Sequence, residues 1–191
     1  RSDPGRMHSL VSSLEIGRIR DFEHWPEGHA LRIEAEASDG WSGDFAFSRL
    51  LGDARTYVPL GTETALNLRV RGGWASESAP VQKRFTLGGV GSVRGYAQNS
   101  FEGGRFALAN AELTLRDVFL FVPDLQISGL IDAGWTSEAR TSTYRDGEML
   151  SAGVGLSYRD RFARLELAWP LVNAPAGADT PAVWLRLNPT F

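Results

Sequence analysis

The sequence predicts an all-β fold, specifically a transmembrane antiparallel β-barrel whose apolar side chains face lipid. Apolar and polar residues alternate with a period of two in stretch after stretch, and a helical period is hard to find. These stretches run to about 9–12 residues, whereas strands of soluble proteins are mostly about 5–6 residues long. The polar side of the stretches is unusually charged, which a water-filled lumen tolerates.

Nine strands are expected, each bounded by Gly, Pro, Asp or Asn residues. They lie near 9–20, 29–38, 43–57, 64–76, 105–116, 124–135, 149–159, 162–172 and 182–191. The charged side is clear in the second strand, where Arg32, Glu34 and Glu36 share one face. It recurs in the fourth strand, where Arg69 and Arg71 share a face.

The alternation is clearest in two of the later strands. In 106–116, alanines and leucines occupy one side, and Asn110 and Glu112 belong to the other. In 163–171, Leu165 and its apolar neighbours oppose Arg164 and Glu166. Both stretches therefore have one apolar and one polar face, as a barrel wall between lipid and lumen requires.

Connection lengths favour a membrane barrel over a soluble sandwich or small barrel with its apolar face inward. From residue 77 onward they alternate between long and short: 77–104, 117–123, 136–148, 160–161 and 173–181. The connections before residue 77 do not show this alternation of long and short lengths well. Nine is also an odd number, and an open sheet edge cannot face hydrocarbon. Either strands precede Arg1 in the native protein, or the count is wrong by one.

Composition excludes several classes of function. The 191 residues carry a formal net charge of −3, which has the wrong sign for a general nucleic-acid binder. The absence of cysteine rules out disulfides, a thiolate zinc site and a cysteine nucleophile. His8, His24 and His29 lack metal-ligand spacing, and Ser92 lacks the Gly-x that a nucleophile elbow needs. We therefore expect no catalytic, metal or cofactor site.

The segment 85–96, FTLGGVGSVRGY, is rich in glycine, so a phosphate-binding loop has to be considered. In a dinucleotide fingerprint that starts at Gly89, the third glycine would fall at Arg94. The Gly-Lys-Ser/Thr of a P-loop is absent as well. Nucleotide binding is therefore not expected.

The pattern FxLGGxxSVRGY instead resembles the signature of the BamA/TamA-type outer-membrane protein family. In that family the motif lies on a long external loop between strands 11 and 12 of a 16-stranded barrel, and the loop folds back into the lumen. Four expected strands precede the loop here and five follow it. The resemblance therefore implies that 1–191 is the C-terminal nine-strand part of one barrel domain, with 77–104 as the lumen-plugging loop.

The motif can also be interpreted physically. A guanidinium inside a barrel needs carboxylate partners, because it stays charged and its burial is costly. Strand parity places Glu112 and Asp132 on the polar faces of adjacent strands, so we expect Arg94 to cross the lumen and bond one or both. Gly95 would let the backbone pass close to the wall, and Tyr96 would pack as an amphipathic plug. The alternative is a surface arginine in an unconstrained loop.

Further matches extend the resemblance over the whole chain. Val93 belongs to the VRGY motif, and Gly129–Gly134 is similar to the family's G-x-x-D-x-G segment, which contains Asp132. The end of the chain is similar to the family's C-terminal signal strand, with Leu185, Leu187 and Phe191 on one face. Asn188 stands where the family usually has glycine, a mild departure because asparagine tolerates unusual backbone angles.

The resemblance implies an outer-membrane barrel that helps to insert or translocate other polypeptides, in a Gram-negative bacterium or a related organelle. It implies no enzyme activity and no cofactor. The implied partners are outer-membrane lipid, unfolded outer-membrane or secreted client polypeptides and accessory periplasmic proteins, with no nucleic acid. An alternative is an anchor or export barrel for an upstream enzyme domain, such as a lipase or peptidase. A passive porin is less compatible with a long plugging loop.

Overall fold

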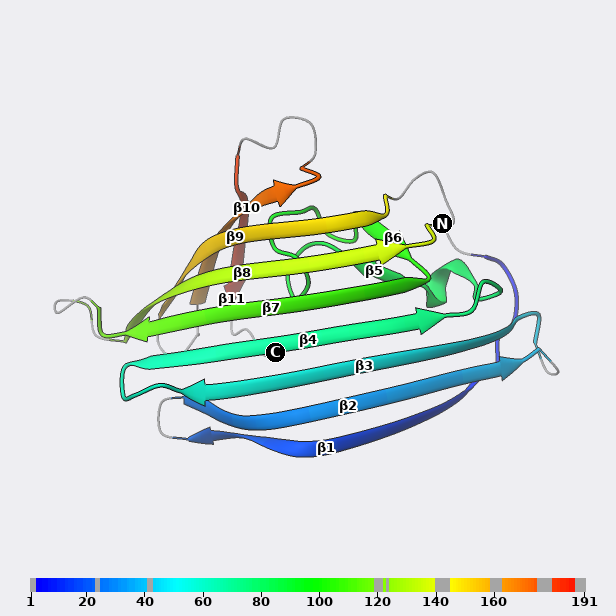
Figure 1. Ribbon diagram of the computed structural model, residues 1–191, viewed down its shortest axis with the longest axis horizontal. Helices are drawn as coiled ribbons and strands as arrows, with labels where there is room; N and C mark the ends of the chain where they lie inside the picture. Colours follow the sequence, from blue (N-terminus) through cyan, green and yellow to red (C-terminus); the bar gives the residue numbers. More distant parts are fainter. Residues whose placement is uncertain are drawn as a thin grey trace.

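Nine long strands form one antiparallel sheet in which each strand pairs with the next along the chain (Figure 1). This computed structural model describes residues 3–22, 25–40, 43–118, 122, 124–139, 145–158, 163–174 and 180–187. The strands are β1 (Leu10–Phe22), β2 (Trp25–Asp39), β3 (Ala46–Pro59), β4 (Thr64–Ala75), β7 (Arg105–Arg116), β8 (Leu125–Ser137), β9 (Gly147–Tyr158), β10 (Ala163–Val172) and β11 (Ala182–Leu187). The nine predicted strands are thus confirmed.

The boundaries differ mainly in the second strand, which was expected to begin at residue 29. Pro26 and Gly28 favour a turn, but both residues continue the pairing with β1, opposite Asp21 and Ile19. Gly28 adopts a φ of 120°, which a side-chain-bearing residue rarely adopts. The predicted end of the last strand, 188–191, lies outside the described residues.

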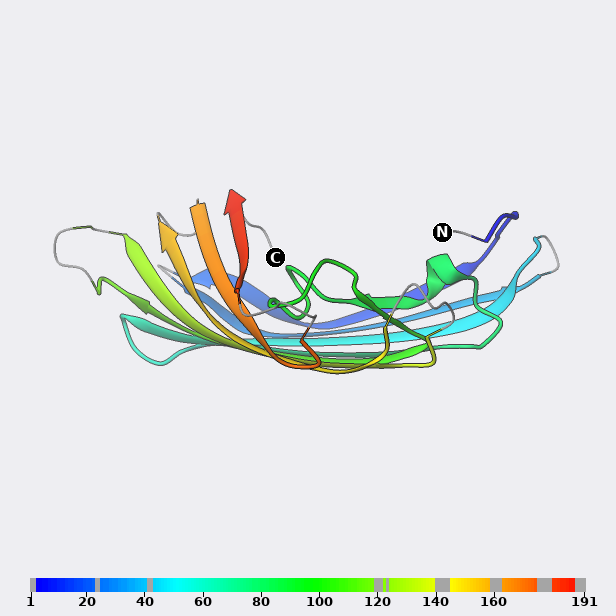
Figure 2. The same ribbon diagram turned by 90° about the horizontal axis from the view of Figure 1, so that it is seen from above.

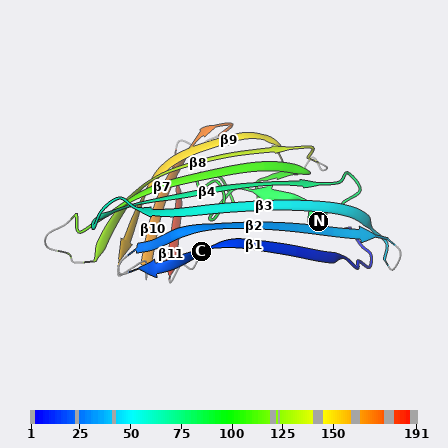
Figure 3. The ribbon, with the colours of Figure 1, turned by 60° about the horizontal axis from the view of Figure 1, so that its bottom comes forward.

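The sheet is strongly curved and open, with β1 and β11 at its two edges (Figures 2 and 3). Its convex face carries an apolar band that runs from strand to strand. Large exposed side chains of this band are Leu14, Ile16, Leu31, Ile33, Leu50, Leu68, Val70, Trp74, Leu113, Leu115, Ile131, Trp135, Val154, Leu156, Leu165, Trp169, Val183, Leu185 and Leu187. An open, curved sheet with a lipid-type exterior is part of a transmembrane barrel, and the soluble sandwich is excluded.

The helical content does not provide a membrane span. Within the described ranges, no helix has the length and apolarity needed to cross a bilayer.

The segment 77–104 lies on the concave side of the sheet (Figure 2). Expected as a plain loop, it contains a short 3-10 helix, η1 (Val81–Lys83), and a two-stranded sheet of β5 (Phe85–Leu87) and β6 (Phe101–Gly103). Strands of three residues are too short to show a period, so the sequence pattern did not predict them.

The main apolar core lies between this loop and the inner wall of the sheet. It consists of Phe47, Ala75, Ala79, Phe85, Leu87, Val93, Tyr96, Phe101, Phe106, Leu108 and Met149. The loop contributes Ala79, Phe85, Leu87, Val93, Tyr96 and Phe101, and strands of the wall contribute the others. Burial of these side chains holds the base and the tip of the loop against the sheet.

Candidate functional site

Arg94 at the tip of the loop is bound to Asp132 on β8. The guanidinium donates two nearly parallel hydrogen bonds, from Nε to Oδ2 and from Nη2 to Oδ1, both 2.8 Å long. The backbone N–H of Arg94 also donates to Oδ2 at 3.0 Å. Asp132 is fully buried, and Arg94 is 6% exposed. The contact is therefore a desolvated bidentate ion pair, which also fixes the backbone of the loop tip.

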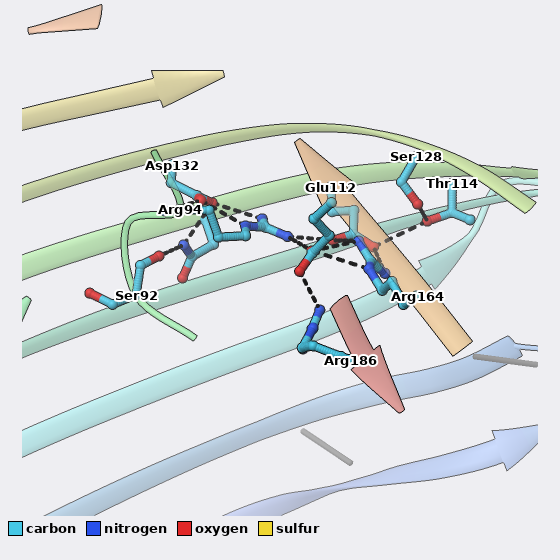
Figure 4. A network of polar contacts seen from close by, with 10 residues as sticks. Ser92, Arg94, Glu112, Thr114, Ser128, Asp132, Arg164 and Arg186 are labelled. Carbon is cyan, nitrogen blue, oxygen red and sulfur yellow. Dashed lines mark hydrogen bonds and ion pairs between the residues drawn. The ribbon is translucent and has the colours of Figure 1, made fainter. Parts of the chain in front are cut away.

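The remaining nitrogen of Arg94, Nη1, joins the loop to two more carboxylates. It lies 3.0 Å from Glu112 Oε2 on β7 and 2.8 Å from Glu166 Oε1 on β10. Arg164 forms a second bidentate pair with Glu112, with both bonds 2.8 Å long. Arg186 on β11 lies 3.0 Å from Glu166 Oε2. Figure 4 shows Arg94, Asp132, Glu112, Arg164 and Arg186 close together, and the bonds of Glu166 to Arg94, Arg164 and Arg186 complete one continuous network.

The Arg94 network, defined as Arg94, Arg164, Arg186, Glu112, Asp132 and Glu166, has three positive and three negative charges. Such balance is what allows six ionisable groups to stay charged in a largely buried place. Burial alone would lower the pKa of Arg94, but its bonds to Asp132 and the charges of Glu112 and Glu166 raise that pKa above its ordinary value.

The sequence predicts Arg94, Glu112 and Asp132 as partners, and the structure brings these three together. Arg164, Glu166 and Arg186 belong to the site as well, and the sequence does not predict their part in it. A signal was present for two of them, because parity places Arg164 and Glu166 on the polar face of their strand. Parity alone does not predict how far the side chains of Arg164 and Glu166 extend across the neighbouring strands.

How far Arg164 and Glu166 extend across the sheet depends on β9, whose inner face is made of small residues from Ser151 to Ser157. Ser151, Gly153, Gly155 and Ser157 line it. A Cβ on Gly155 would lie 3.1 Å from Arg164 Nη2. The small side chains therefore leave room for Arg164 to pass over β9 and reach Glu112 on β7, and for Glu166 to reach Arg94.

Val93 and Tyr96 fix the loop tip on either side of Arg94. Val93 is fully buried, and a Cβ on Gly134 of β8 would lie 2.6 Å from its Cγ2. Tyr96 Oη accepts a 3.1 Å hydrogen bond from Leu150 N and contacts the carbonyl oxygens of Leu150 and Val172. The Val172 carbonyl lies beside a register irregularity between β9 and β10.

Two glycines of the motif have different roles. Gly91 has a φ of 76° and open space around it, so it provides the turn. Gly95 provides close approach instead. A Cβ on Gly95 would lie 2.8 Å from Pro170 N and 2.9 Å from Ser151 Cβ. The loop backbone therefore lies directly on β9 and β10.

We predict that Gly95→Ala weakens docking of the loop by about 1–3 kcal/mol, because the added methyl group overlaps backbone atoms that cannot move freely. Limited proteolysis of the folded protein within 77–104 should become faster. Gly129→Ala is the matched control, because a Cβ there meets nothing within 4 Å. Equal proteolysis rates for the two variants would contradict the close-packing role of Gly95.

Of the other residues singled out in the sequence, Asn110 joins the network, because its Nδ2 donates a 2.8 Å hydrogen bond to Asp132 Oδ1. Leu185 and Leu187 are 70% and 69% exposed on the convex face, whereas Phe191 lies outside the described residues. His8 and His29 are described and His24 is not. In the described part of the chain, no group of three or more His, Cys, Asp and Glu residues is placed to hold a metal.

Comparison with known proteins identifies relatives of the same architecture. The family described as the Omp85 superfamily domain matches residues 18–185. The outer membrane protein assembly factor BamA of Nitratidesulfovibrio vulgaris (strain Hildenborough) is 27% identical over 145 residues, which are 66% of this chain and 18% of that protein. The chain thus spans about a fifth of that relative.

Two solved structures share the fold. BamA from Haemophilus ducreyi lacking POTRA domains 1–3 superposes with a TM-score of 0.65 at 16% identity, covering 91% of this chain and 41% of that one. CdiB from Acinetobacter baumannii gives a TM-score of 0.62 at 19% identity, covering 93% and 33%.

Proposed function

The chain belongs to the Omp85 superfamily, and from that premise we propose that it is the C-terminal part of a barrel that helps to insert or translocate other polypeptides. Membership confirms the kinship with BamA/TamA-type barrels expected from the motif, together with the outer-membrane location. The number of strands on each side of the loop, four before and five after, supports placing the chain at the C-terminal end of a 16-stranded barrel.

The observation that carries the proposal is the docking of loop 77–104 through Arg94. Carboxylates from β7, β8 and β10 converge on one guanidinium, so the loop tip is fixed on the concave wall by three strands. A loop held in this way occupies the space that a passive pore would leave open. We therefore propose that 77–104 plugs the lumen and is part of the polypeptide-handling machinery.

The proposed partners follow from the two faces of the sheet. The apolar band contacts outer-membrane lipid, and the concave side meets unfolded outer-membrane or secreted client polypeptides, with accessory periplasmic proteins assisting. We propose no covalent step and no cofactor. The alternative, a membrane anchor for an upstream enzyme, is not favoured, because the curated relative is named as an assembly factor.

The proposal is tested by reconstituting the full-length protein in liposomes and adding a urea-unfolded eight-stranded outer-membrane barrel as client. Folding of the client, followed by its heat-modifiable mobility on gels, should be accelerated about tenfold or more over empty liposomes. Liposomes that hold a passive porin at equal density provide the control for disturbed lipid packing. A client folding rate equal to that control would refute the proposed function.

A further inference from the structure

A second charged group lies on the inner face of β3 and β4, next to the Arg94 network. We call Arg55, Arg69 and Arg71 the β3–β4 arginine strip. All three contact Asp53: Arg55 through Nη2 at 3.1 Å, Arg69 through Nη2 at 2.5 Å and Arg71 through Nε at 3.3 Å. The β3–β4 register places Arg55 opposite Arg69 and Asp53 opposite Arg71. Parity and strand pairing thus gather three guanidiniums around one carboxylate.

The strip is not balanced by the carboxylates described around it. Among the described residues, Asp53 is the one carboxylate that forms ion pairs with the three arginines, and Glu15 attracts Arg55 at longer range. Counting both acids still leaves one excess positive charge. Three guanidiniums also carry about fifteen N–H donors, while one carboxylate offers about four acceptor positions.

The strip is also accessible, unlike the core of the Arg94 network. The side chains of Arg55, Arg69 and Arg71 are 29%, 22% and 26% exposed, whereas Arg94 is 7% and Arg164 0% exposed. The centre of the Arg94 network is therefore less accessible than the strip, although Arg94, Glu112 and Arg186 line the same cavity as Arg69. The strip presents N–H donors to the concave side.

A cavity of about 70 Å³ connects the strip to the loop tip. Arg69, Tyr57, Asn67 and Gly91 are among its lining residues. Arg69 Nη1 donates to the carbonyl of Gly91 at 3.4 Å, so the strip directly contacts the loop. Asn67 Oδ1 is buried without a hydrogen-bond partner. The volume has room for about two water molecules or one carboxylate group.

From this combination we propose that the β3–β4 arginine strip binds an acidic, extended segment of a polypeptide. A side-chain carboxylate would accept hydrogen bonds from Arg69 and Arg71 in the bidentate geometry that guanidinium favours. A peptide N–H would supply the donor that Asn67 Oδ1 lacks, and a free inorganic anion offers no such donor. The strip lies on the face opposite the apolar band, which separates it from lipid headgroups.

This inference deepens the proposed function and rests on it for the identity of the peptide, which would be a client segment. The strip would hold acidic stretches of a client beside the loop. The binding is electrostatic and partly solvent-exposed, so salt should weaken it.

The test measures fluorescence anisotropy of a labelled decapeptide of alternating glutamate and serine with the full-length protein in detergent. We expect this peptide to bind more tightly than the matching lysine–serine peptide, and more weakly at 300 mM than at 50 mM salt. Arg69→Gln and Arg71→Gln should each reduce affinity about twofold to fivefold, the range expected for exposed ion pairs. Arg105→Gln, in an exposed pair with Glu138, is the matched control.

Equal binding of the two peptides, or unchanged affinity in both strip variants, would overturn the inference. Displacement of the glutamate peptide by an equal concentration of inorganic phosphate or dihexanoyl phosphatidylglycerol would also overturn it, in favour of a general anion site. Heat-modifiable mobility identifies variants that have not folded. Failure of the liposome assay with an intact glutamate preference would count against the proposed function and leave the strip standing.

Discussion

Replacing Arg94 with alanine is expected to release loop 77–104 from the wall while the strands still pair. The substitution leaves Asp132, Glu112 and Glu166 with only Arg164 and Arg186 as cationic partners inside the network. Removing one partner from a buried ion pair costs about 3–5 kcal/mol, because the remaining charge loses both water and its counter-ion. Here that free energy stabilises the docked loop relative to the undocked one.

Two measurements check the Arg94→Ala prediction. Protease should cut within 77–104 much faster than in the unmodified protein, and client folding in the liposome assay should slow. Heat-modifiable mobility should persist, because the sheet hydrogen bonds do not depend on Arg94. The cleavage rate and the client folding rate of Arg94→Lys should lie between those of Arg94→Ala and the unmodified protein, since an ammonium keeps the charge but cannot form the bidentate pair. Unaltered protection of the loop in Arg94→Ala would refute the docking role.

Replacing Glu166 with glutamine is expected to loosen the last described strand as well as the loop. One oxygen of Glu166 binds Arg94 and Arg164, and the other lies 3.0 Å from Arg186 on β11. Glu166 is fully buried, so a neutral amide would leave three arginines sharing two carboxylates in a largely buried place. We expect a loss of about 3 kcal/mol in docking of the loop and pairing of β11.

Hydrogen exchange measures this second effect strand by strand. Amides of β11 and of the loop tip should exchange faster in Glu166→Gln, whereas those of β2 and β3 should not change. Glu138→Gln provides the control, because Glu138 forms its ion pair with Arg105 at an exposed position. Accelerated exchange at the loop but not at β11 would show that Glu166 does not join the two.

Much of the wall could be predicted from the sequence, because apolar and polar residues alternate along each barrel strand and so mark its two faces. The alternation in 106–116 and 163–171 reappears as alternating buried and exposed residues along β7 and β10. The same parity placed Glu112 and Asp132 on the polar side, where the structure has both in contact with Arg94. Two-residue periodicity is a local property, so no knowledge of the neighbouring strands was needed.

Other features of the site depend on distances that no local pattern contains. Arg164 reaches Glu112, and Glu166 reaches Arg94, only because the sheet curves and because β9 carries small residues on its inner face. The strands β5 and β6 exist because two three-residue segments of the loop meet each other over the wall. The excess positive charge around Asp53 likewise appears only when β3 and β4 are paired in register.

The residue pattern is enough to predict a barrel wall with one apolar and one polar side, and a glycine-rich loop whose arginine needs carboxylate partners. Which carboxylates bind that arginine, how many strands supply them and where excess positive charge remains become visible only in the folded sheet. Face alternation is encoded residue by residue, whereas ion pairing across a curved sheet depends on register, curvature and the size of the side chains in between.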